Sequence, residues 1–400
     1  MNILVFTSLW PSRAEPNFCV FVKHRALALS RIDGVDLRVV APVPYFPKGI
    51  NSRFIPRGWR VKAQIPERES IEGIEVLRPR YLLTPKVGMS FYARWMASGA
   101  ESILRNMHSQ TPIDLIDAHY VYPDGYAAII LGRALNIPVS ITARGTDIIH
   151  FPKLRLIRPK ICKALRNATG LIAVSSNLKK RMMSLGIEEE KIAVIRNGID
   201  HRIFFPCDRA EVRKKLNLDP QAKIIVTVAG LVPRKGIARL IDAMAFLNND
   251  RLKLYVIGEG PERGRLESKI ARLNLRDRVF LPGACPQSLL VEWYSAADLF
   301  CLASYDEGCP NVVLEAIACG IPVLAIDAGG VADLIVKQSY GRVVSFTSVK
   351  DFASQIRAAL ESNWNKSEIA DYGRQRSWGN VADELIEYYR QRGIMREKEG

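Results

Sequence analysis

Two carboxylates lie eight positions apart in the stretch YDEGCPNVVLEAIACGIPVLA, residues 305–325. Glu307 precedes a predicted helix, which Pro310 can begin because its missing N–H costs nothing in a first turn. Glu315 lies about a turn and a half into that helix, and Gly320 suits its end. The N-terminus of such a helix offers free N–H groups and a positive dipole end to an anion. One interpretation makes the pair solvated charges, but carboxylates flanked by apolar segments need partners.

The elements that must position these residues follow a regular alternation. Apolar, β-branched runs alternate with helical patterns along the whole chain, which is typical of parallel sheets built from βαβ units. In the first half we expect strands at 2–7, 36–43, 115–120, 138–143 and 170–175, and helices near 18–31, 90–107, 124–135, 154–167 and 176–185. In the second half we expect strands at 223–230, 252–258, 278–283, 298–304 and 321–326. Residues 47–88, rich in Pro, Gly and Arg, interrupt this rhythm and predict an inserted loop or hairpin.

At 400 residues the chain is too long for one ordinary core, so two domains are expected. The boundary falls within 194–208, where a strand ends in Asn-Gly and an irregular stretch leads to Pro206. We therefore predict two doubly wound, Rossmann-like α/β domains, 1–200 and 201–377, that face each other across a cleft. Such sheets bind ligands at the carboxyl ends of their strands. A last helix within 378–400 is predicted to cross back to the first domain.

The composition, 48% apolar and 24% charged, is that of a soluble globular chain. The seven cysteines form no Cys-x-x-Cys pair, and the histidines show no zinc-ligand spacing, so no metal site is expected. The first residues predict a strand and not a signal peptide, and no stretch approaches the roughly 20 apolar residues that span a bilayer. No Gly-x-Ser-x-Gly elbow marks a nucleophile. A cytoplasmic location is therefore expected.

The net charge of +16 is unevenly spread. Residues 1–200 hold 29 Lys and Arg against 16 Asp and Glu, whereas the second half holds 28 against 25. The first half is expected to meet something anionic, and nucleic acid and a membrane surface both qualify. The segment 153–170 predicts a cationic amphipathic surface, in which Lys and Arg surround Leu154, Leu156, Ile157, Ile161 and Leu165. The alternative is a solvated helix face opposite a core stripe.

Several segments together resemble one enzyme family. EGCPNVVLEAIACGIPVLA is similar to the Glu-x7-Glu signature of retaining GT-B glycosyltransferases of family 4. VAGLVPRKGIARLIDAM, 228–244, resembles that family's donor-phosphate loop and helix, and VIGEGPERGRLE, 256–267, resembles the segment beneath the nucleotide. The opening FTSLWPSRAEPNFCVFVKHRALAL, with VVAPVPYFP and HYVYPDG, is most similar to the subgroup of teichuronic-acid and exopolysaccharide transferases. The resemblance covers nearly the whole chain.

The resemblance implies a role for each glutamate. In the family the first contacts hydroxyls of the donor sugar and the second binds the ribose hydroxyls, which assigns these roles to Glu307 and Glu315. Ionised carboxylates suit neutral polyols because their oxygens accept strong charge-assisted hydrogen bonds. The donor-site loops that the resemblance implies also include Gly308, Pro310, Asn311, Gly258 and Glu259.

The leaving nucleoside diphosphate must be neutralised, and the chain has no Asp-x-Asp motif to hold a metal. The PRKG loop ends a predicted strand and begins a helix, so Lys235, Arg234 and helix N-termini are expected to bind the donor phosphate without a metal or other cofactor. The alternative is a surface turn with two solvated cations. The donor is expected to be a UDP- or GDP-sugar.

Two positions depart from the family pattern. The Arg that usually lies five positions before the Lys is Gly230 here. Where many members have a Gly-rich loop near the donor phosphate, this chain has AEPNFCVF, with Phe18 or Cys19 in place of the glycine. Arg234 is the candidate to reach the phosphate that the missing Arg would contact.

His119, at a predicted strand end, is the candidate of the first domain for the reaction centre, because a family His at this position reaches toward the donor sugar. A hydrogen-bonded core histidine is the alternative. Asp124 in YPDG is a candidate contact for an acceptor hydroxyl, or a helix cap. ARGTD, 143–147, matches a segment that more often contains His-Gly-x-Asp. Arg144 in place of that His suggests a contact to an anionic acceptor or phosphate, or a salt bridge with Asp147.

The resemblance thus implies a retaining hexosyltransferase that moves a sugar from a nucleotide-sugar to a hydroxyl of a polysaccharide or lipid-linked glycan. The leaving phosphate oxygen is expected to help take the acceptor proton, while Glu307 positions the sugar. Such an acceptor and the basic first half favour contact with the cytoplasmic face of an anionic membrane. The alternatives are a nucleotide-sugar epimerase on the same fold and a non-enzymatic nucleic-acid binder. No nucleic-acid partner is expected, because the predicted cleft and not the basic segment carries the aromatic cluster Tyr120, Tyr122 and Tyr126.

Overall fold

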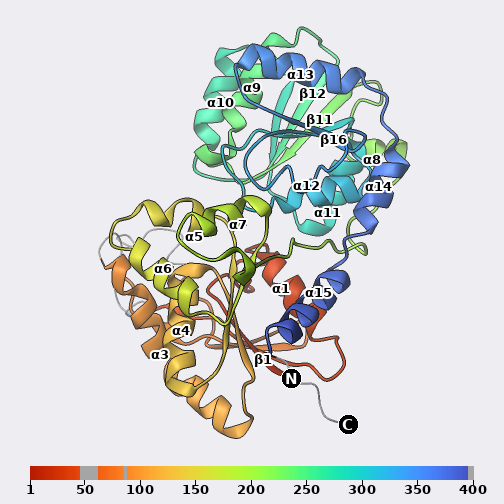
Figure 1. Ribbon diagram of the computed structural model, residues 1–400. Helices are drawn as coiled ribbons and strands as arrows, with labels where there is room; N and C mark the ends of the chain where they lie inside the picture. The colour runs from red at the N-terminus through yellow and green to blue at the C-terminus, as the bar shows by residue number, and fades with distance from the viewer. Residues whose placement is uncertain (46–61, 85–87, 395–400) are drawn as a thin grey trace. The chain divides into compact units, whose positions relative to one another are not determined.

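The computed structural model describes residues 1–45, 62–84 and 88–394, and its chain divides into two compact units (Figure 1). Unit 1 comprises Met1–Asn197 together with Trp378–Gly400, and unit 2 comprises Gly198–Ser377. Part of the predicted insertion at 47–88 lies outside the described residues. Its described part contains the antiparallel hairpin of β4 and β5, and β5 joins the main sheet of unit 1.

Unit 1 is built on an eight-stranded sheet in the order β10-β9-β8-β7-β1-β2-β5-β4. All neighbouring strands are parallel except β4 and β5. The strands are β1 Asn2–Phe6, β2 Asp36–Val40, β4 Arg68–Ile71, β5 Ile74–Leu77, β7 Leu115–His119, β8 Val139–Ala143, β9 Gly170–Ala173 and β10 Ile192–Val194. A separate parallel pair consists of β3 Val43–Pro44 and β6 Arg80–Tyr81. The central strands are buried on both faces, which explains their continuous apolar runs.

Helices cover both faces of this sheet (Figure 1). They are α1 Val20–Leu29, α3 Tyr92–Gln110, α4 Tyr126–Leu135, α5 Thr146–Ile149, α6 Arg158–Asn167, α7 Ser176–Met183 and α15 Trp378–Gln391. The last helix, α15, packs its apolar stripe on α1 and on β1, with Leu385 and Tyr389 fully buried against Ile3. The predicted helix at 154–167 begins later than expected, at Arg158, because the backbone before it forms a short 3-10 turn and then irregular turns.

Unit 2 contains a six-stranded, entirely parallel sheet in the order β13-β12-β11-β14-β15-β16. Its strands are β11 Lys223–Val228, β12 Leu252–Ile257, β13 Val279–Gly283, β14 Leu299–Leu302, β15 Val323–Ile326 and β16 Gly341–Val344. The strand β16 was not predicted from the sequence. The helices are α8 Arg209–Lys215, α9 Ile237–Phe246, α10 Arg263–Arg272, α11 Gln287–Ala296, α12 Asn311–Ala318, α13 Val349–Glu361 and α14 Lys366–Arg374.

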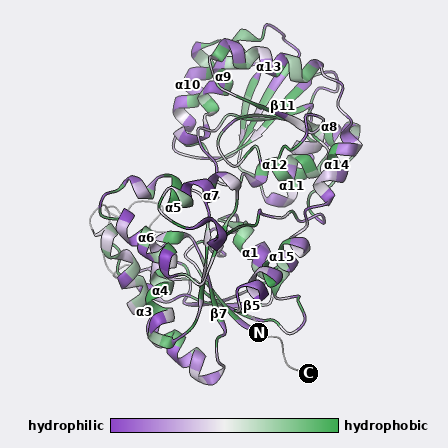
Figure 2. Ribbon diagram, viewed as in Figure 1, coloured by the Kyte–Doolittle hydropathy of each residue, from purple (hydrophilic) through white to green (hydrophobic). Residues whose placement is uncertain are grey.

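Two apolar layers hold the sheet of unit 2, one on each face. Alternate residues of β11 point to opposite sides, so that Ile224 and Val226 pack with α11 and α12 while Ile225 packs with α9, α10 and α13. In Figure 2 the strands are mostly green and the helices alternate green with purple, as expected for helices with one face on the core.

The strand orders determine where ligands can bind. In a doubly wound sheet the crevice lies at the carboxyl ends of the two strands between which the winding reverses. This point lies between β11 and β14 in unit 2 and between β1 and β7 in unit 1. In each unit, the loops that leave these two strands therefore carry the candidate residues.

Candidate active site

The loop after β11 holds Lys235 next to the carboxyl end of β14. A 3-10 turn, Pro233–Lys235, leads into Gly236, whose φ of +64° allows α9 to begin at once. A Cβ at Gly236 would lie 1.9 Å from the carbonyl oxygen of Ala303, so the loop can approach β14 only with glycine at this position. The backbone N–H of Tyr305 also donates to the carbonyl of Arg234 (2.9 Å). The two switch-point loops are thus joined through their backbones.

Glu307 lies in the loop after β14 and is held from three sides. Its Oε1 accepts hydrogen bonds from Lys235 Nζ and from Ser304 Oγ, each at 2.6 Å. Its backbone N–H donates to Ala328 (2.6 Å), and its carbonyl accepts from Gly330 (3.1 Å). The residue is only 6% exposed, so the interpretation of Glu307 as a solvated loop charge is wrong. The structure pairs the predicted sugar-binding carboxylate directly with the predicted phosphate-binding ammonium.

Glu315 is the fifth residue of α12 and is also 6% exposed, which excludes the solvated interpretation for it too. Its Oε2 accepts a hydrogen bond from the hydroxyl of Tyr294 on α11 (2.7 Å). Burial raises the pKa of Glu315 to about 7, although hydrogen bonds from Tyr294 and Gln287 oppose the shift. This carboxyl is therefore only partly ionised at neutral pH, whereas a full charge was expected from the sequence.

The helix α12 that carries Glu315 ends as predicted. Gly320 has φ of +74° and donates its N–H to Ile317 (2.9 Å), and Ile321 donates to Ala316 (3.0 Å), which is the Schellman arrangement. At the other end Pro310 is the N-cap, one position before the helix, and Asn311 is the first helical residue. Gly308 lies three positions before this first helical residue.

Gly258 and Glu259, also predicted at the donor site, support the Lys235 loop. Gly258 has φ of +152°, and a Cβ there would lie 1.9 Å from the carbonyl oxygen of Ala229. The carbonyl of Glu259 accepts from Leu231 (2.9 Å). The carboxylate of Glu259 is half exposed and pairs with Arg263 on the next helix (2.6 Å). The structure therefore gives both residues a role in shaping the loop.

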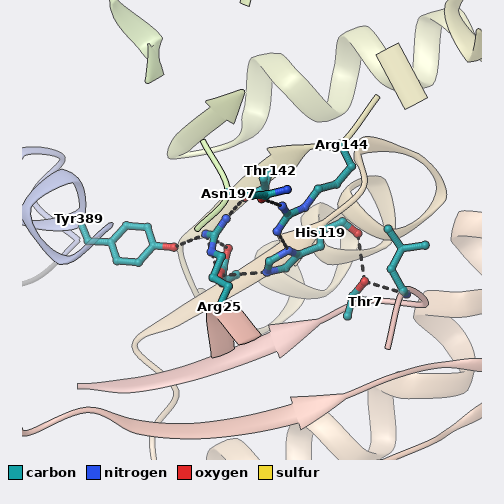
Figure 3. Close-up of polar contacts among 9 residues, drawn as sticks. Thr7, Arg25, His119, Thr142, Arg144, Asn197 and Tyr389 are labelled. Carbon is teal, nitrogen blue, oxygen red and sulfur yellow. Dashed lines mark hydrogen bonds and ion pairs between the residues drawn. The ribbon is translucent and has the colours of Figure 1, made fainter. Parts of the chain in front are cut away.

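In unit 1, His119 ends β7 inside a buried polar network (Figure 3). Arg144 lies against Nδ1 of His119, and Oδ2 of Asp117 lies 3.3 Å from Nε2. A guanidinium can only donate, so Nδ1 accepts and Nε2 carries the proton. Burial, with Arg144 and Arg25 nearby, lowers the pKa of His119 to about 3 despite Asp117. His119 is therefore a neutral histidine with both ring nitrogens engaged, as the core-histidine alternative described.

Arg25 on α1 completes this network and was not predicted from the sequence. It donates to Thr142 Oγ1 (2.8 Å), to Asp117 (3.1 Å) and to the hydroxyl of Tyr389 on α15 (3.2 Å). Burial alone would raise the pKa of Asp117, but Arg25 and His119 outweigh it and hold that pKa at about 2. Asp117 could have been predicted from the sequence. It precedes His119 by two residues, and residues two apart on a strand lie on the same face.

Arg144 does not use Asp147 in the way that the salt-bridge alternative assumed. Its guanidinium donates to Asn197 Oδ1 (2.8 Å) and contacts His119. The carboxylate of Asp147 accepts instead from backbone N–H groups of Arg144, Gly145 and Val121, at 2.7–3.2 Å. Asp147 thus shapes the turn, and Arg144 lies beside the histidine at the carboxyl edge of the sheet.

Asp124 lies at the switch point of unit 1. Its Oδ1 accepts from the backbone N–H of Ser8, in the loop after β1, and its Oδ2 is buried with no hydrogen-bond partner among the described residues. Burial raises the pKa of Asp124 to about 7. The helix-cap alternative is wrong, because Gly125 is the N-cap of α4 and that helix has no side-chain cap.

The segment without the family's glycines adopts a glycine-like conformation nonetheless. Cys19 has φ of +46° and ψ of +38°, the left-handed region, directly before α1. Burial raises the pKa of its thiol to about 12. Cys19, and not Phe18, therefore occupies the backbone position that a glycine would suit.

The described residues contain no helix with the length and apolar character that a bilayer span requires. They also contain no group of three or more His, Cys, Asp or Glu side chains arranged to hold a metal ion.

These features define a class. Two Rossmann-like units with candidate residues at both switch points form a GT-B glycosyltransferase fold, as in sucrose-phosphate synthase from Thermosynechococcus elongatus, which matches with a TM-score of 0.78 at 20% identity over 98% of both chains. Anabaena HepE, solved with UDP, matches with a TM-score of 0.73 at 20% identity over 98% of this chain and all of that one.

The family follows from the sequence comparisons. Residues 208–376 match the family described as Glycosyl transferases group 1, and residues 20–202 match Glycosyltransferase Family 4. TuaC of Bacillus subtilis (strain 168), named as a glycosyltransferase of teichuronic acid biosynthesis, is 32% identical over 93% of this chain and 92% of its own. The chain belongs to the family 4, group 1 glycosyltransferases.

Proposed function

We propose that the protein is a retaining hexosyltransferase that uses a nucleotide-sugar donor without a metal ion. The observation that carries the proposal is the Lys235–Glu307 pair at the switch point of unit 2. An ammonium and a carboxylate 2.6 Å apart match the two halves of a nucleotide-sugar, since one is attracted to phosphate and the other accepts from sugar hydroxyls.

In this proposal a bound donor separates Lys235 from Glu307. The diphosphate binds the ammonium of Lys235 in place of Glu307, and hydroxyls of the sugar donate hydrogen bonds to the carboxylate of Glu307. Arg234, which is exposed on the same turn, and the N-terminus of α12 add positive potential for the leaving diphosphate. Glu315 accepts from the ribose hydroxyls in its ionised form. No step requires a metal ion or another cofactor.

Unit 1 is the proposed acceptor side. A neutral His119 with a pKa of about 3 is a poor general base, which supports a reaction in which the leaving phosphate oxygen takes the acceptor proton on the face from which it departs. His119 would then orient the donor sugar through its neighbours, while Asp124 and Arg144 would contact the acceptor. A guanidinium there suits an anionic glycan such as one that contains uronic acids.

The proposed acceptor is a polysaccharide or a lipid-linked glycan, and the proposed location is the cytoplasmic face of the membrane. The relative TuaC is named for biosynthesis of an envelope polysaccharide, and HepE was solved with UDP-glucose. These names support a UDP-sugar as the first donor to test.

Thermal shift with UDP-, GDP-, ADP- and dTDP-sugars tests the donor site, because a ligand that binds the folded state raises its stability. We expect one nucleotide class to raise the Tm, and we expect Lys235→Ala and Glu315→Ala to lose that rise. Lys214→Ala, at an exposed position of α8, is the matched control and should keep it. A shift that both site variants retain would contradict the assignment. Conversion of the donor sugar without an acceptor would instead favour an epimerase.

A further inference from the structure

Two leucines are exposed in one turn of unit 1, between the 3-10 turn Phe151–Lys153 and α6. Leu154 is 45% exposed and Leu156 is 72% exposed, the highest exposure among the large apolar side chains of the described residues. A single exposed leucine is normal on a protein surface and needs no explanation. Two exposed leucines in one turn therefore indicate a function only where a second feature of the same turn supports it.

The second feature is the positive charge around the two leucines. Lys153, Arg155 and Arg158 alternate with the leucines and are all exposed. Within the described chain these three cations have no ion-pair partner. From residue 148 to residue 187 the sequence has nine Lys and Arg and no Asp or Glu. The turn therefore presents two apolar side chains among exposed, unpaired cations.

The neighbouring helix does not supply this apolar surface. The sequence pattern predicted Ile157, Ile161 and Leu165 on the same amphipathic face as Leu154 and Leu156. In the structure the first three are buried in the core of unit 1, and only the two leucines before α6 remain outside. An amphipathic helix lying on a surface is thus excluded, and a short protruding turn takes its place.

We propose that residues 153–158, the leucine turn, dock unit 1 on an anionic lipid bilayer. The three cations lie among the headgroups, and Leu154 and Leu156 enter the boundary between headgroups and acyl chains. Nucleic acid would favour aromatic side chains among the cations for base stacking, and the turn has leucines instead. The choice of a bilayer rests on the proposed function only in that a lipid-linked acceptor would bring the enzyme to a membrane.

Co-sedimentation of the full chain with vesicles tests the proposal, using phosphatidylcholine alone or mixed with phosphatidylglycerol. We expect binding only with phosphatidylglycerol, weakened by high salt. The triple change Lys153→Glu, Arg155→Glu and Arg158→Glu should weaken it by about 100-fold, at roughly fivefold per cation. The same charge change at three exposed positions of unit 2, Lys214→Glu, Arg272→Glu and Arg276→Glu, should leave most of the binding in place.

The leucines are tested without a change of charge. Leu154→Ser with Leu156→Ser should weaken vesicle binding by about tenfold, since both would otherwise leave water on docking. The matched control, Leu82→Ser with Leu289→Ser, alters leucines that are 50% and 41% exposed elsewhere and should have no effect. Equal loss in both pairs, or no loss in the first, would overturn the insertion of the turn.

Two further results would overturn docking itself. One is vesicle binding that ignores phosphatidylglycerol and salt, and the other is binding of a single-stranded oligonucleotide, lost in the triple variant, with none to vesicles. All substituted positions are exposed, and the Tm of each variant verifies its folding. The vesicle assay needs no donor, and the thermal shift with nucleotide-sugars needs no vesicle. A negative vesicle result therefore leaves the proposed transferase function untouched, and a negative thermal shift leaves the proposed docking untouched.

Discussion

At the scale of single residues, burial has opposite outcomes for the carboxyl groups of Asp117 and Glu315. In unit 1, Arg25 compensates Asp117 so fully that the pKa of the carboxyl falls to about 2. In unit 2, Glu315 has only a tyrosine hydroxyl and an amide as partners, and burial raises its pKa to about 7. A compensated carboxylate is a fixed part of the structure. A buried carboxylate with few partners is stabilised in its ionised form when a ligand donates hydrogen bonds to it, as ribose hydroxyls would.

The raised pKa of Glu315 predicts a pH-dependent loss of stability. In the unfolded chain the group ionises near 4.5, and in the folded chain near 7, so between these values the folded state holds the extra proton. The protonated carboxyl therefore makes its full contribution to the free energy of unfolding below pH 4.5. This contribution is lost as the pH rises through about 7. Glu315→Gln, which stays neutral, should be more stable than the wild type at pH 8 by up to about 3 kcal/mol and not at pH 4.5.

Denaturant unfolding of both proteins at the two pH values measures this difference. Asp124 has a pKa raised in the same direction, but it is present in both proteins and cancels from the comparison. A difference between variant and wild type that does not change with pH would contradict the prediction.

Gly230, where the resemblance to the family implies an arginine, predicts a gain of function. A Cβ there would meet only the carbonyl oxygen of Glu259, at 3.8 Å, and its φ lies outside the left-handed region, so a side chain fits. Gly230→Arg should keep the Tm and tighten binding of the nucleotide-sugar by about threefold to tenfold, because it adds a cation to the Lys235 loop. Isothermal titration calorimetry measures the Kd, with Gly230→Ala as the uncharged control. Equal Kd values for both variants would contradict a phosphate contact at this position.

At the scale of elements, the alternation of strands and helices was predictable because each central strand is buried on both faces and must be apolar. The start of α6 was not predicted, since Leu154 and Leu156 continue a helical pattern that the backbone does not follow. Pro159 was the available signal, because proline suits a first turn and disfavours helical backbone at the residue before it. Motif spacing identified Lys235, Glu307 and Glu315 as candidates. Tyr294, the partner of Glu315, and Arg25, the partner of Asp117, reach those carboxylates only through tertiary packing.

The junction between the Lys235 loop and α9 predicts the cost of adding one methyl group. Gly236→Ala should destabilise unit 2 by more than about 3 kcal/mol, because its Cβ would lie 1.9 Å from the Ala303 carbonyl and its φ is left-handed. Gly264→Ala is the matched control, since a Cβ there meets nothing within 4 Å, and it should stabilise α10 by about 0.5–1 kcal/mol. Denaturant unfolding measures both variants. Similar stabilities would show that the loop can move away from β14 at little cost.

At the scale of the whole molecule, unit 1 is discontinuous in sequence and unit 2 is continuous. The helix α15 returns after 180 residues of unit 2 and supplies Leu385 and Tyr389 to the core over β1. It also satisfies polar groups, because the hydroxyl of Tyr388 accepts from the N–H of Leu171 (2.7 Å) and donates to its carbonyl (3.1 Å). Its removal would expose apolar surface on β1 and leave Arg25 without the Tyr389 hydroxyl.

This connectivity predicts different behaviour for fragments of the two units. The fragment 198–377 should unfold in one cooperative transition, because its sheet, both apolar layers and all seven helices lie within it. The fragment 1–197 should lack a cooperative transition and should regain one when 378–400 is co-expressed with it. Circular dichroism melts and limited proteolysis measure both effects. In the full chain, Tyr389→Phe removes only the hydroxyl and should cost about 1 kcal/mol, which separates that hydrogen bond from the apolar packing of α15. If 1–197 unfolded cooperatively alone, the apolar packing of α15 would add to the stability of unit 1 without being required for its fold.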